Sequence, residues 1–430
     1  MSRIAVIGAG PAGLWAARRA VQRGHDVVVH ERGARPGGMA ASFEVDGVRV
    51  DHGSHRLHPA TDDEILREID ALLHGTLQWR PRNGRIRLLD RWVRFPLSPI
   101  DLARNLPPRF AAAAIGDALV PRRERADTYA EVVRAGLGPA MLEHFYGPYA
   151  RKLWGEEPER LAGHQARTRI SASTPLAMVR KLAVRQRPHF WYPRDGFGAI
   201  VDALVPEAGD VRCGSEVTSL DELDADHIWS TIPLPVLARL AGDTTDHGLR
   251  FRSLVLVHVV VPTRPWTPFD AHYLPGPETA LTRLTEVQNY RSSAADPLDR
   301  TVLCAELPCA IGDAHWSMSD DALGALVARD IEALGLPPIE VSQVHVTRQP
   351  AAYPIYDLGF EAKLARLEAM TSALPRVTSF GRGGLFAHDN THHALAEGDA
   401  AAACLRDDGS WDDVRWAMER ARFRGHVVED

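Results

Sequence analysis

The first 31 residues contain the parts of a site for a dinucleotide phosphate. Gly8, Gly10 and Gly13 separate an apolar, strand-like stretch from a helical pattern. Gly8 permits a tight turn, Gly10 lets the backbone approach a pyrophosphate, and Gly13 lets the helix lie close to the strand. Glu31 ends a second strand-like stretch 18 residues beyond Gly13, close to the roughly 20 residues expected for an acid that binds a ribose hydroxyl. These residues predict a βαβ dinucleotide-binding unit.

The residues after Glu31 favour FAD over NAD. Arg35, Gly37, Gly38 and Met39 follow it, and an acid, a base and a glycine pair in this order resemble amine oxidases, phytoene desaturases and protoporphyrinogen oxidases. The resemblance implies that the glycine pair lets the backbone run against the ribityl chain and flavin edge. Arg35 is long enough to reach the pyrophosphate. Met39 is expected at the cofactor, at a position where many relatives carry an arginine.

A second segment near the C-terminus is predicted to complete the FAD site. Gly381 and Arg382 lie where a strand-like stretch enters a glycine turn, and residues 394–402 form a helical pattern of small residues that includes Gly398. In flavoproteins of this type, the N-terminus of that helix points at the N1/O2 edge of the flavin, where negative charge gathers on reduction. We expect Gly381, Arg382, Asn390 and Gly398 to contact FAD.

Several further segments resemble UDP-galactopyranose mutase. They are, in chain order, residues 53–58, 90–96, 152–155, 282–286 and 353–357. The resemblance implies that Arg169 and Arg283 bind an anionic group of the substrate, because guanidinium forks match phosphate or carboxylate. It also implies substrate contacts for Trp154, Tyr353 and Tyr356.

Histidines are the predicted acid–base groups. His388 falls where the mutase carries a tyrosine that touches the diphosphate, and histidine acts as a base when neutral or donates to phosphate when protonated. His55 and His58 lie in a segment expected beside the flavin. Either one of them contacts flavin or substrate, or both are structural histidines bound to backbone carbonyls. We predict catalytic roles for His388, His55 and His58.

A metal site is the alternative for one histidine-rich segment. His388, Asp389, His392 and His393 are clustered in sequence, and such residues bind zinc when their geometry is consistent. Because the flavin already supplies the chemistry, we predict that no metal is bound.

The secondary-structure patterns alternate along the chain. Residues 43–51 form a hairpin pattern with an Asp-Gly turn, and residues 85–96 form a second hairpin. Helical spacing runs from residue 100 to about 178, and clear strands follow at 254–261 and 341–348. We interpret the arginines of the second hairpin region as mainly solvent-facing, since alternation puts half of a hairpin outside. They are Arg80, Arg82, Arg85, Arg87, Arg91 and Arg94.

The predicted fold class is α/β, with a Rossmann-type FAD-binding domain interleaved with two other units. We assign residues 1–75, 192–240 and 372–425 to the discontinuous FAD-binding domain. Residues 76–191 are predicted to form a helical lobe, and residues 241–371 a β-rich substrate domain.

Composition excludes some partners. The chain has 430 residues and a formal net charge of −6, which gives no electrostatic reason to expect nucleic acid. No apolar run reaches the length of a membrane span, and the four cysteines contain no CxxC pair. We therefore expect a cytoplasmic protein with reduced cysteines and a small-molecule substrate. The oligomeric state and the external electron partner, whether oxygen, a quinone or NAD(P)H, are left open.

Three functions are compatible with these residues. The favoured one is an FAD-dependent oxidoreductase of a biosynthetic pathway that accepts a hydride from a polar, anionic or sugar-like small molecule. The second is a redox-neutral nucleotide-sugar mutase that uses reduced FAD. The third is a non-enzymatic carrier on the same fold, against which the full set of FAD residues argues.

Overall fold

The N-terminal βαβ unit forms as the glycine spacing predicts. The computed structural model describes residues 1–119, 126–170 and 189–428. Strand β1 (Arg3–Ile7), helix α1 (Pro11–Gln22) and strand β2 (Asp26–Glu31) follow in order, and the two strands pair in parallel. Gly8 has φ of +106°, and a Cβ atom on Gly13 would lie 2.2 Å from the carbonyl oxygen of Gly8. Only glycine therefore allows this turn and this close approach of α1.

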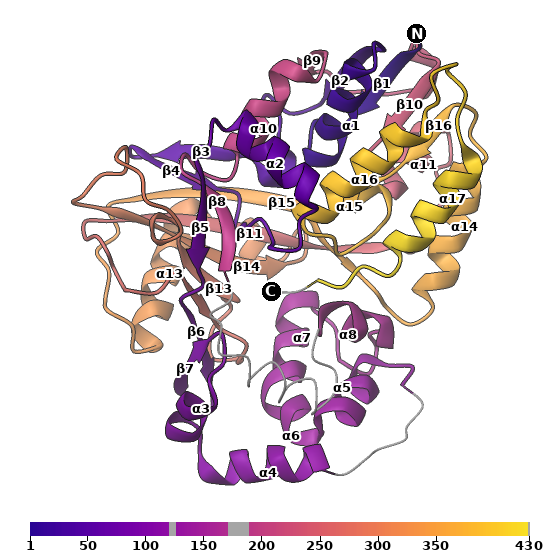
Figure 1. Ribbon diagram of the computed structural model, residues 1–430. Helices are drawn as coiled ribbons and strands as arrows, with labels where there is room; N and C mark the ends of the chain where they lie inside the picture. Colours follow the sequence, from indigo (N-terminus) through magenta and orange to yellow (C-terminus); the bar gives the residue numbers. More distant parts are fainter. Residues whose placement is uncertain (120–125, 171–188, 429–430) are drawn as a thin grey trace.

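A parallel sheet of five strands carries the unit. Its order is β16 (Val377–Ser379), β10 (His227–Ser230), β1, β2 and β9 (Asp210–Cys213). Segments from both ends and the middle of the chain thus share one sheet, and Figure 1 shows α1 and α16 (Thr391–Cys404) lying together beside it. Alternate residues of β1 face opposite sides of the sheet, each packed into its own buried core.

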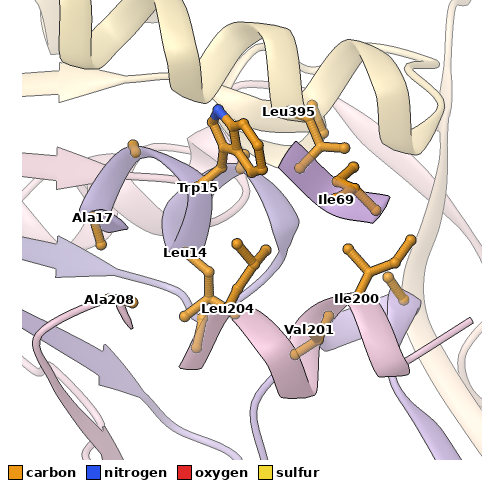
Figure 2. Close-up of a cluster of buried hydrophobic side chains, with 14 of the residues drawn as sticks. Leu14, Trp15, Ala17, Ile69, Ile200, Val201, Leu204, Ala208 and Leu395 are labelled. Atoms are coloured by element: carbon orange, nitrogen blue, oxygen red, sulfur yellow. The ribbon is translucent and has the colours of Figure 1, made fainter. Parts of the chain in front are cut away.

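The larger core lies between α1, α16 and the short helices α2 (Asp63–Leu72) and α10 (Ala199–Leu204). Figure 2 shows its central side chains, and Trp15 is fully buried among them. The labelled members are Leu14, Trp15, Ala17, Ile69, Ile200, Val201, Leu204, Ala208 and Leu395. Burying a large apolar side chain stabilises the fold by about 1.5–3 kcal/mol, so this core holds α1 firmly against the sheet.

The second sheet has seven strands. Its order is β15 (Gln343–Ile355), β11 (Arg250–Val261), β14 (Thr301–Cys309), β13 (Arg283–Glu286), β12 (Ala271–Tyr273), β6 (Gly84–Leu88) and β7 (Arg91–Phe95). Helix α13 (Asp320–Ala333) packs on one face through a separate core. This arrangement corrects the predicted boundary of the helical lobe, because the hairpin β6–β7 pairs with β12 and extends this sheet.

The same pairing corrects the interpretation of the hairpin arginines. Arg91 and Arg94 are exposed as expected, but Arg82 is buried. The guanidinium of Arg85 lies 4.3 Å from the ring centroid of Trp92 and 4.5 Å from that of Phe269. Aromatic faces attract a guanidinium group, and burial lowers the pKa of Arg85 to about 10.

Helices dominate between β7 and β8 (His189–Pro193). They are α3 (Pro99–Asn105), α4 (Pro108–Leu119), α5 (Tyr129–Leu137), α6 (Pro139–Met141), α7 (Gly147–Trp154) and α8 (Gly163–Arg169). The last part of the predicted helical pattern, residues 171–178, lies outside the described residues. Lys152 on α7 connects this lobe to the second sheet, because its Nζ donates to the carbonyl oxygens of Leu274 and Leu281 at 2.6 and 3.0 Å.

The remaining elements connect these layers. They are β3 (Ser42–Val45), β4 (Val48–Asp51), β5 (Leu77–Pro81), α11 (Leu234–Leu240), α12 (Ala314–Ser317), α14 (Phe360–Ser372), α15 (Gly381–Gly384) and α17 (Asp413–Phe423). The predicted Asp-Gly hairpin is confirmed as β3–β4, with positive φ at Asp46 and Gly47. Among the described residues, no helix combines the length and the apolar character needed to cross a bilayer.

Candidate functional site

The turn after β1 forms a cradle for a phosphate. Glu31 fixes it, because its Oε2 accepts from the backbone N–H of Ala9 at 3.0 Å and its Oε1 accepts from that of Gly33 at 2.8 Å. A Cβ atom on Gly10 would meet no protein atom within 4 Å. The space beside Gly10, at the N-terminus of α1, therefore fits the pyrophosphate of a dinucleotide.

The glycine pair closes over this turn. Gly37 and Gly38 have φ of +113° and +52°, and the N–H of Gly37 donates to Ala9 O at 2.7 Å. A Cβ atom on Gly38 would lie 3.9 Å from the Cα of Gly10. Arg35 is exposed, and Met39 is partly buried. Their contacts with FAD stay predictions.

The C-terminal segment returns to the same turn. Gly381 has φ of +79°, and its Cβ position lies 3.1 Å from the Cβ of Ala12 on α1. Asn390 is the N-cap of α16, so this helix starts three residues earlier than the predicted position 394. A Cβ atom on Gly398 would lie 2.4 Å from Ala12 O. This position gives Gly398 a packing role between α16 and α1, and its FAD contact stays a prediction.

An ion pair that the sequence did not suggest lies beside the predicted substrate residues. Arg283 on β13 and Glu306 on β14 are direct cross-strand neighbours. Their contact is bidentate: Arg283 Nη2 lies 2.8 and 2.9 Å from the two carboxylate oxygens, and its Nε lies 3.0 Å from Oε1. The backbone N–H of Ser54 also donates to Glu306 at 3.0 Å. The predicted flavin-side segment 53–58 and Arg283 therefore meet at one buried carboxylate.

Tyr353 lies among three guanidinium groups. Burial and the charge of Glu306 raise the pKa of its hydroxyl, while Arg283, Arg382 and Arg169 lower it. The guanidinium of Arg382 lies 5.4 Å from the centroid of its ring. We call Arg169, Arg283, Arg382, Tyr353 and Glu306 the arginine–tyrosine cluster.

The pKa of Arg382 is lowered by burial and by a neighbouring positive charge. Burial lowers its pKa most, and repulsion from Arg169 lowers it further. Arg382 donates to the carbonyl oxygens of Asp389 at 3.0 Å and Ala352 at 2.6 Å, and these groups carry no formal charge. The cluster thus contains three guanidinium groups and one carboxylate, and the charge of Asp389 also acts on Arg382 by raising its pKa. Three guanidinium groups near two carboxylates favour an anionic ligand.

The environment of His388 argues against a role as general base, and its catalytic role stays a prediction. The N–H of Tyr356 donates to Gln165 Oε1 at 3.1 Å, which fixes the side-chain amide of Gln165. The amide nitrogen then donates to His388 Nε2 at 2.8 Å. Burial, with repulsion from Arg169 and Arg382, lowers the pKa of His388 well below 6.5. His388 is therefore a neutral hydrogen-bond acceptor whose Nε2 lone pair is already used.

Trp154 and Tyr356 are buried, and their substrate contacts stay predictions. Trp154 is 2% exposed and packs in the lobe core, 5.5 Å from Tyr129 between ring centroids. The hydroxyl of Tyr356 donates to Phe386 O at 2.9 Å, and its ring stacks on Phe360 at 4.2 Å. Both aromatic side chains are therefore packed against other protein side chains.

His55 and His58, the two histidines predicted beside the flavin, differ in their hydrogen bonds and ring contacts. His55 stacks on Phe197 at 5.2 Å, and burial lowers its pKa to about 4 although Glu306 raises it. Its Nδ1 has no hydrogen-bond partner among the described residues. His58 accepts from the N–H of Ala60 at 3.0 Å and stacks on His392 at 4.9 Å. His55 is thus the better candidate for proton transfer, and both catalytic roles stay predictions.

The four residues considered for a metal do not assemble, because His388 is held by Gln165. Donor atoms of Asp389, His393 and His426 do lie within 4.8 Å of one another. Hydrogen bonds account for this approach: His426 Nδ1 lies 2.9 Å from Asp389 Oδ1, and His393 Nδ1 accepts from the N–H of Asn390 at 3.2 Å.

The fold and the dinucleotide turn define the class of protein. Residues 6–71 match the family model described as an NAD(P)-binding Rossmann-like domain. In fold, the chain resembles solved UDP-galactopyranose mutase, a protoporphyrinogen oxidase-like protein and amine oxidases, in agreement with the predicted resemblance and with the α/β fold class. The comparisons also agree with FAD as the cofactor.

The chain is similar to several known proteins. The flavin-dependent L-tryptophan oxidase RebO of Lentzea aerocolonigenes is 29% identical over 309 residues, which cover 59% of this chain and 64% of that enzyme. Reduced UDP-galactopyranose mutase has a TM-score of 0.81 at 18% identity and full coverage of both chains. Cyclohexylamine oxidase of Brevibacterium oxydans has a TM-score of 0.67 at 14% identity, covering 97% of this chain and all of that one.

Proposed function

We propose that the protein is an FAD-dependent oxidoreductase that removes a hydride from a carbon bonded to nitrogen or oxygen in a small carboxylate or phosphate compound. The observation that carries the proposal is the arginine–tyrosine cluster, in which Arg382 lies 5.4 Å from the ring centroid of Tyr353 and Arg283 pairs with Glu306. The charges of Arg169, Arg283, Arg382 and Glu306 all act on the hydroxyl of Tyr353. The cluster adjoins segment 53–58 through Glu306. An anionic group bound there would orient the rest of the substrate toward that segment.

The residues have separate roles in this proposal. FAD, held by the cradle at Gly10 and Glu31, supplies the two-electron acceptor. Arg169 and Arg382 bind the anionic group, while Arg283 keeps its pair with Glu306. His55 is neutral above pH about 4 and accepts the proton that leaves the substrate nitrogen or oxygen. Reoxidation then requires an external acceptor, for which oxygen, a quinone and NAD(P)⁺ are the candidates.

The relatives support an acid as substrate class. RebO is named for an amino acid that carries a carboxylate, whereas the amine named in cyclohexylamine oxidase has none. Because this chain surrounds Tyr353 with arginines, we favour an amino or 2-hydroxy acid over a simple amine.

A nucleotide-sugar mutase is the second candidate. It is favoured by the full-length fold match to UDP-galactopyranose mutase. The Arg283–Glu306 pair argues against it, since a diphosphate at Arg283 would have to displace a buried carboxylate bound through three contacts.

Anaerobic mixing separates the candidates. Oxidised enzyme would be mixed with L-amino acids, 2-hydroxy acids, putrescine, cyclohexylamine and UDP-galactopyranose while flavin absorbance is followed. We expect stoichiometric bleaching by an acid and none by the amines. Product from UDP-galactopyranose with chemically reduced enzyme only, and no bleaching by any compound, would replace the oxidoreductase by the mutase.

A further inference from the structure

The last described residues connect the FAD-binding part of the chain to the helical lobe. Figure 1 shows the chain leaving α17 and ending above α7 and α8. The backbone N–H of Val428 donates to the carbonyl oxygen of Thr168 at 2.9 Å, and the Val428 side chain is 2% exposed. Thr168 directly precedes Arg169 at the end of α8.

This hydrogen bond satisfies a group that α8 cannot satisfy itself. The last four carbonyls of an α-helix have no intrahelical donor, and Thr168 O is one of them in a helix of seven residues. Side-chain contacts hold other parts of α8: Gln165 binds His388 and Tyr356, and Arg167 Nη1 donates to Ala126 O at 3.1 Å. The backbone N–H of Gly163 donates to Asp127 O at the start of the helix. Val428 therefore holds the end of the helix that carries Arg169.

His426 anchors the tail to the opposite side. Its Nδ1 lies 2.9 Å from Asp389 Oδ1, and its ring stacks on His393 at 4.1 Å with an interplanar angle of 15°. Asp389 is 3% exposed and follows His388 in the chain. Although burial opposes it, the hydrogen bond from His426 lowers the pKa of Asp389, so the carboxylate accepts from Nδ1–H.

The neighbouring carboxyl group does not compete for this hydrogen bond. Glu397 is fully buried, and burial together with the charge of Asp389 raises its pKa well above 4.5. Its Oε1 lies 3.9 Å from His426 Nδ1, which is beyond hydrogen-bond distance. At the start of the tail, Arg424 Nη2 donates to Glu368 Oε2 on α14 at 2.8 Å. Nearer the lobe, the tail is held by the Asp389 carboxylate and by the backbone of Thr168.

We propose that residues 424–428 are a positioning segment, in which His426 is fixed on Asp389 and Val428 caps α8 so that Arg169 is held toward the substrate. The role of Arg169 rests on the proposed function, but the connection between tail and helix does not. A metal bound by Asp389, His393 and His426 would give the tail a different anchor.

Four variants test the two anchors. His426→Asn keeps a donor near the Nδ1 position, whereas His426→Phe keeps a stacking ring and removes the donor. Val428→Pro removes the N–H that α8 receives. Val427→Ala is the matched control, since Val427 lies in the same segment and is 41% exposed.

Hydrogen exchange of peptide 163–170 in the FAD-loaded enzyme gives a readout that needs no substrate. We expect His426→Phe and Val428→Pro to speed exchange at least about tenfold, with wild-type rates for His426→Asn and Val427→Ala. A chain ending at Val427 replaces Val428→Pro if that variant does not fold. Wild-type exchange in both disruptive variants would overturn the proposal, as would equal acceleration in His426→Asn and His426→Phe.

Anion affinity tests the link to Arg169. With benzoate as probe, followed by flavin absorbance, we expect the dissociation constant to rise about three- to tenfold in the disruptive variants, as for a lost hydrogen bond. Faster exchange with unchanged benzoate affinity would overturn the positioning of Arg169 and leave the oxidoreductase proposal untouched. Acceleration of exchange by EDTA in the wild type would replace our anchor with a metal.

Discussion

The dinucleotide cradle draws on residues 8–38, which follow one another in the chain, whereas the arginine–tyrosine cluster collects side chains from five distant elements. In the cradle, Cβ positions on Gly13 and Gly38 would lie 2.2 and 3.9 Å from backbone atoms of Gly8 and Gly10, within the same turn. In the cluster, Arg169 comes from α8, Arg283 from β13 and Tyr353 from β15. The cradle is thus determined by local backbone geometry, and the cluster by how the second sheet and the lobe meet.

Substitutions at Gly10 and Gly13 should separate the effect on FAD binding from the effect on folding. Gly10→Val adds a side chain where no protein atom lies within 4 Å, so we expect a folded protein that has lost nearly all FAD. Gly13→Val would meet Gly8 O and should prevent folding instead. The flavin-to-protein absorbance ratio and the melting temperature of each variant measure this. A Gly10→Val protein with full FAD content would show that the pyrophosphate lies elsewhere.

Removal of one partner of the Arg283–Glu306 ion pair should lower the free energy of unfolding. Arg283→Ala leaves Glu306 buried without its charged partner, and we expect about 3–5 kcal/mol of lost unfolding free energy. Arg283→Ala combined with Glu306→Ala should recover part of this loss, because no unpaired charge remains. Urea unfolding of FAD-loaded proteins measures both. Equal stability of the single variant and the wild type would contradict the pair as a structural unit.

Arg169 should affect ligand binding more than folding. Losing one charge-assisted contact costs about 1.5–3 kcal/mol, or roughly ten- to a hundredfold in affinity. Arg169→Ala should therefore weaken benzoate binding by this factor with full FAD content. Arg167→Ala is the control, since Arg167 is exposed on the same helix. The proposed anion site is wrong if both variants bind like the wild type.

The lowered pKa of His388 should be visible in the pH dependence of the free energy of unfolding. Its pKa is lowered in the folded protein, so below the unfolded value of about 6.5 the unfolded chain gains a proton that the folded chain does not. Stability is therefore full above pH about 6.5 and falls as the pH drops. Relative to His388→Leu, the wild type should lose up to about 1.4 kcal/mol more per pH unit in that window.

The His388→Leu variant also tests the predicted role of His388 as a general base. A general base typically contributes a hundred- to ten-thousandfold to rate, and we expect His388→Leu to slow flavin reduction less than about tenfold. Urea titrations at pH 7, 6 and 5 and anaerobic flavin reduction check the two effects. An inflection in activity near pH 6.5 that disappears in the variant would restore His388 as the base.

The sequence by itself determined the βαβ unit, the Asp-Gly hairpin and the fold class. These features depend on backbone conformations that glycine spacing and apolar alternation specify locally, as at Gly8 and at Asp46–Gly47. The resemblance also predicted substrate-binding roles for Arg169 and Arg283, whose charges both act on Tyr353 in the structure.

Only the tertiary structure decided how those side chains are used. Glu306 lies 23 residues from Arg283 and becomes its direct neighbour through the β13–β14 register. Gln165 lies 223 residues from His388, yet its donated hydrogen bond removes the lone pair on which a base role depended. Val428 satisfies a helix end 260 residues earlier in the chain. The charge and hydrogen-bonding state of a buried group depend on its neighbours in space, and residue spacing alone does not specify them.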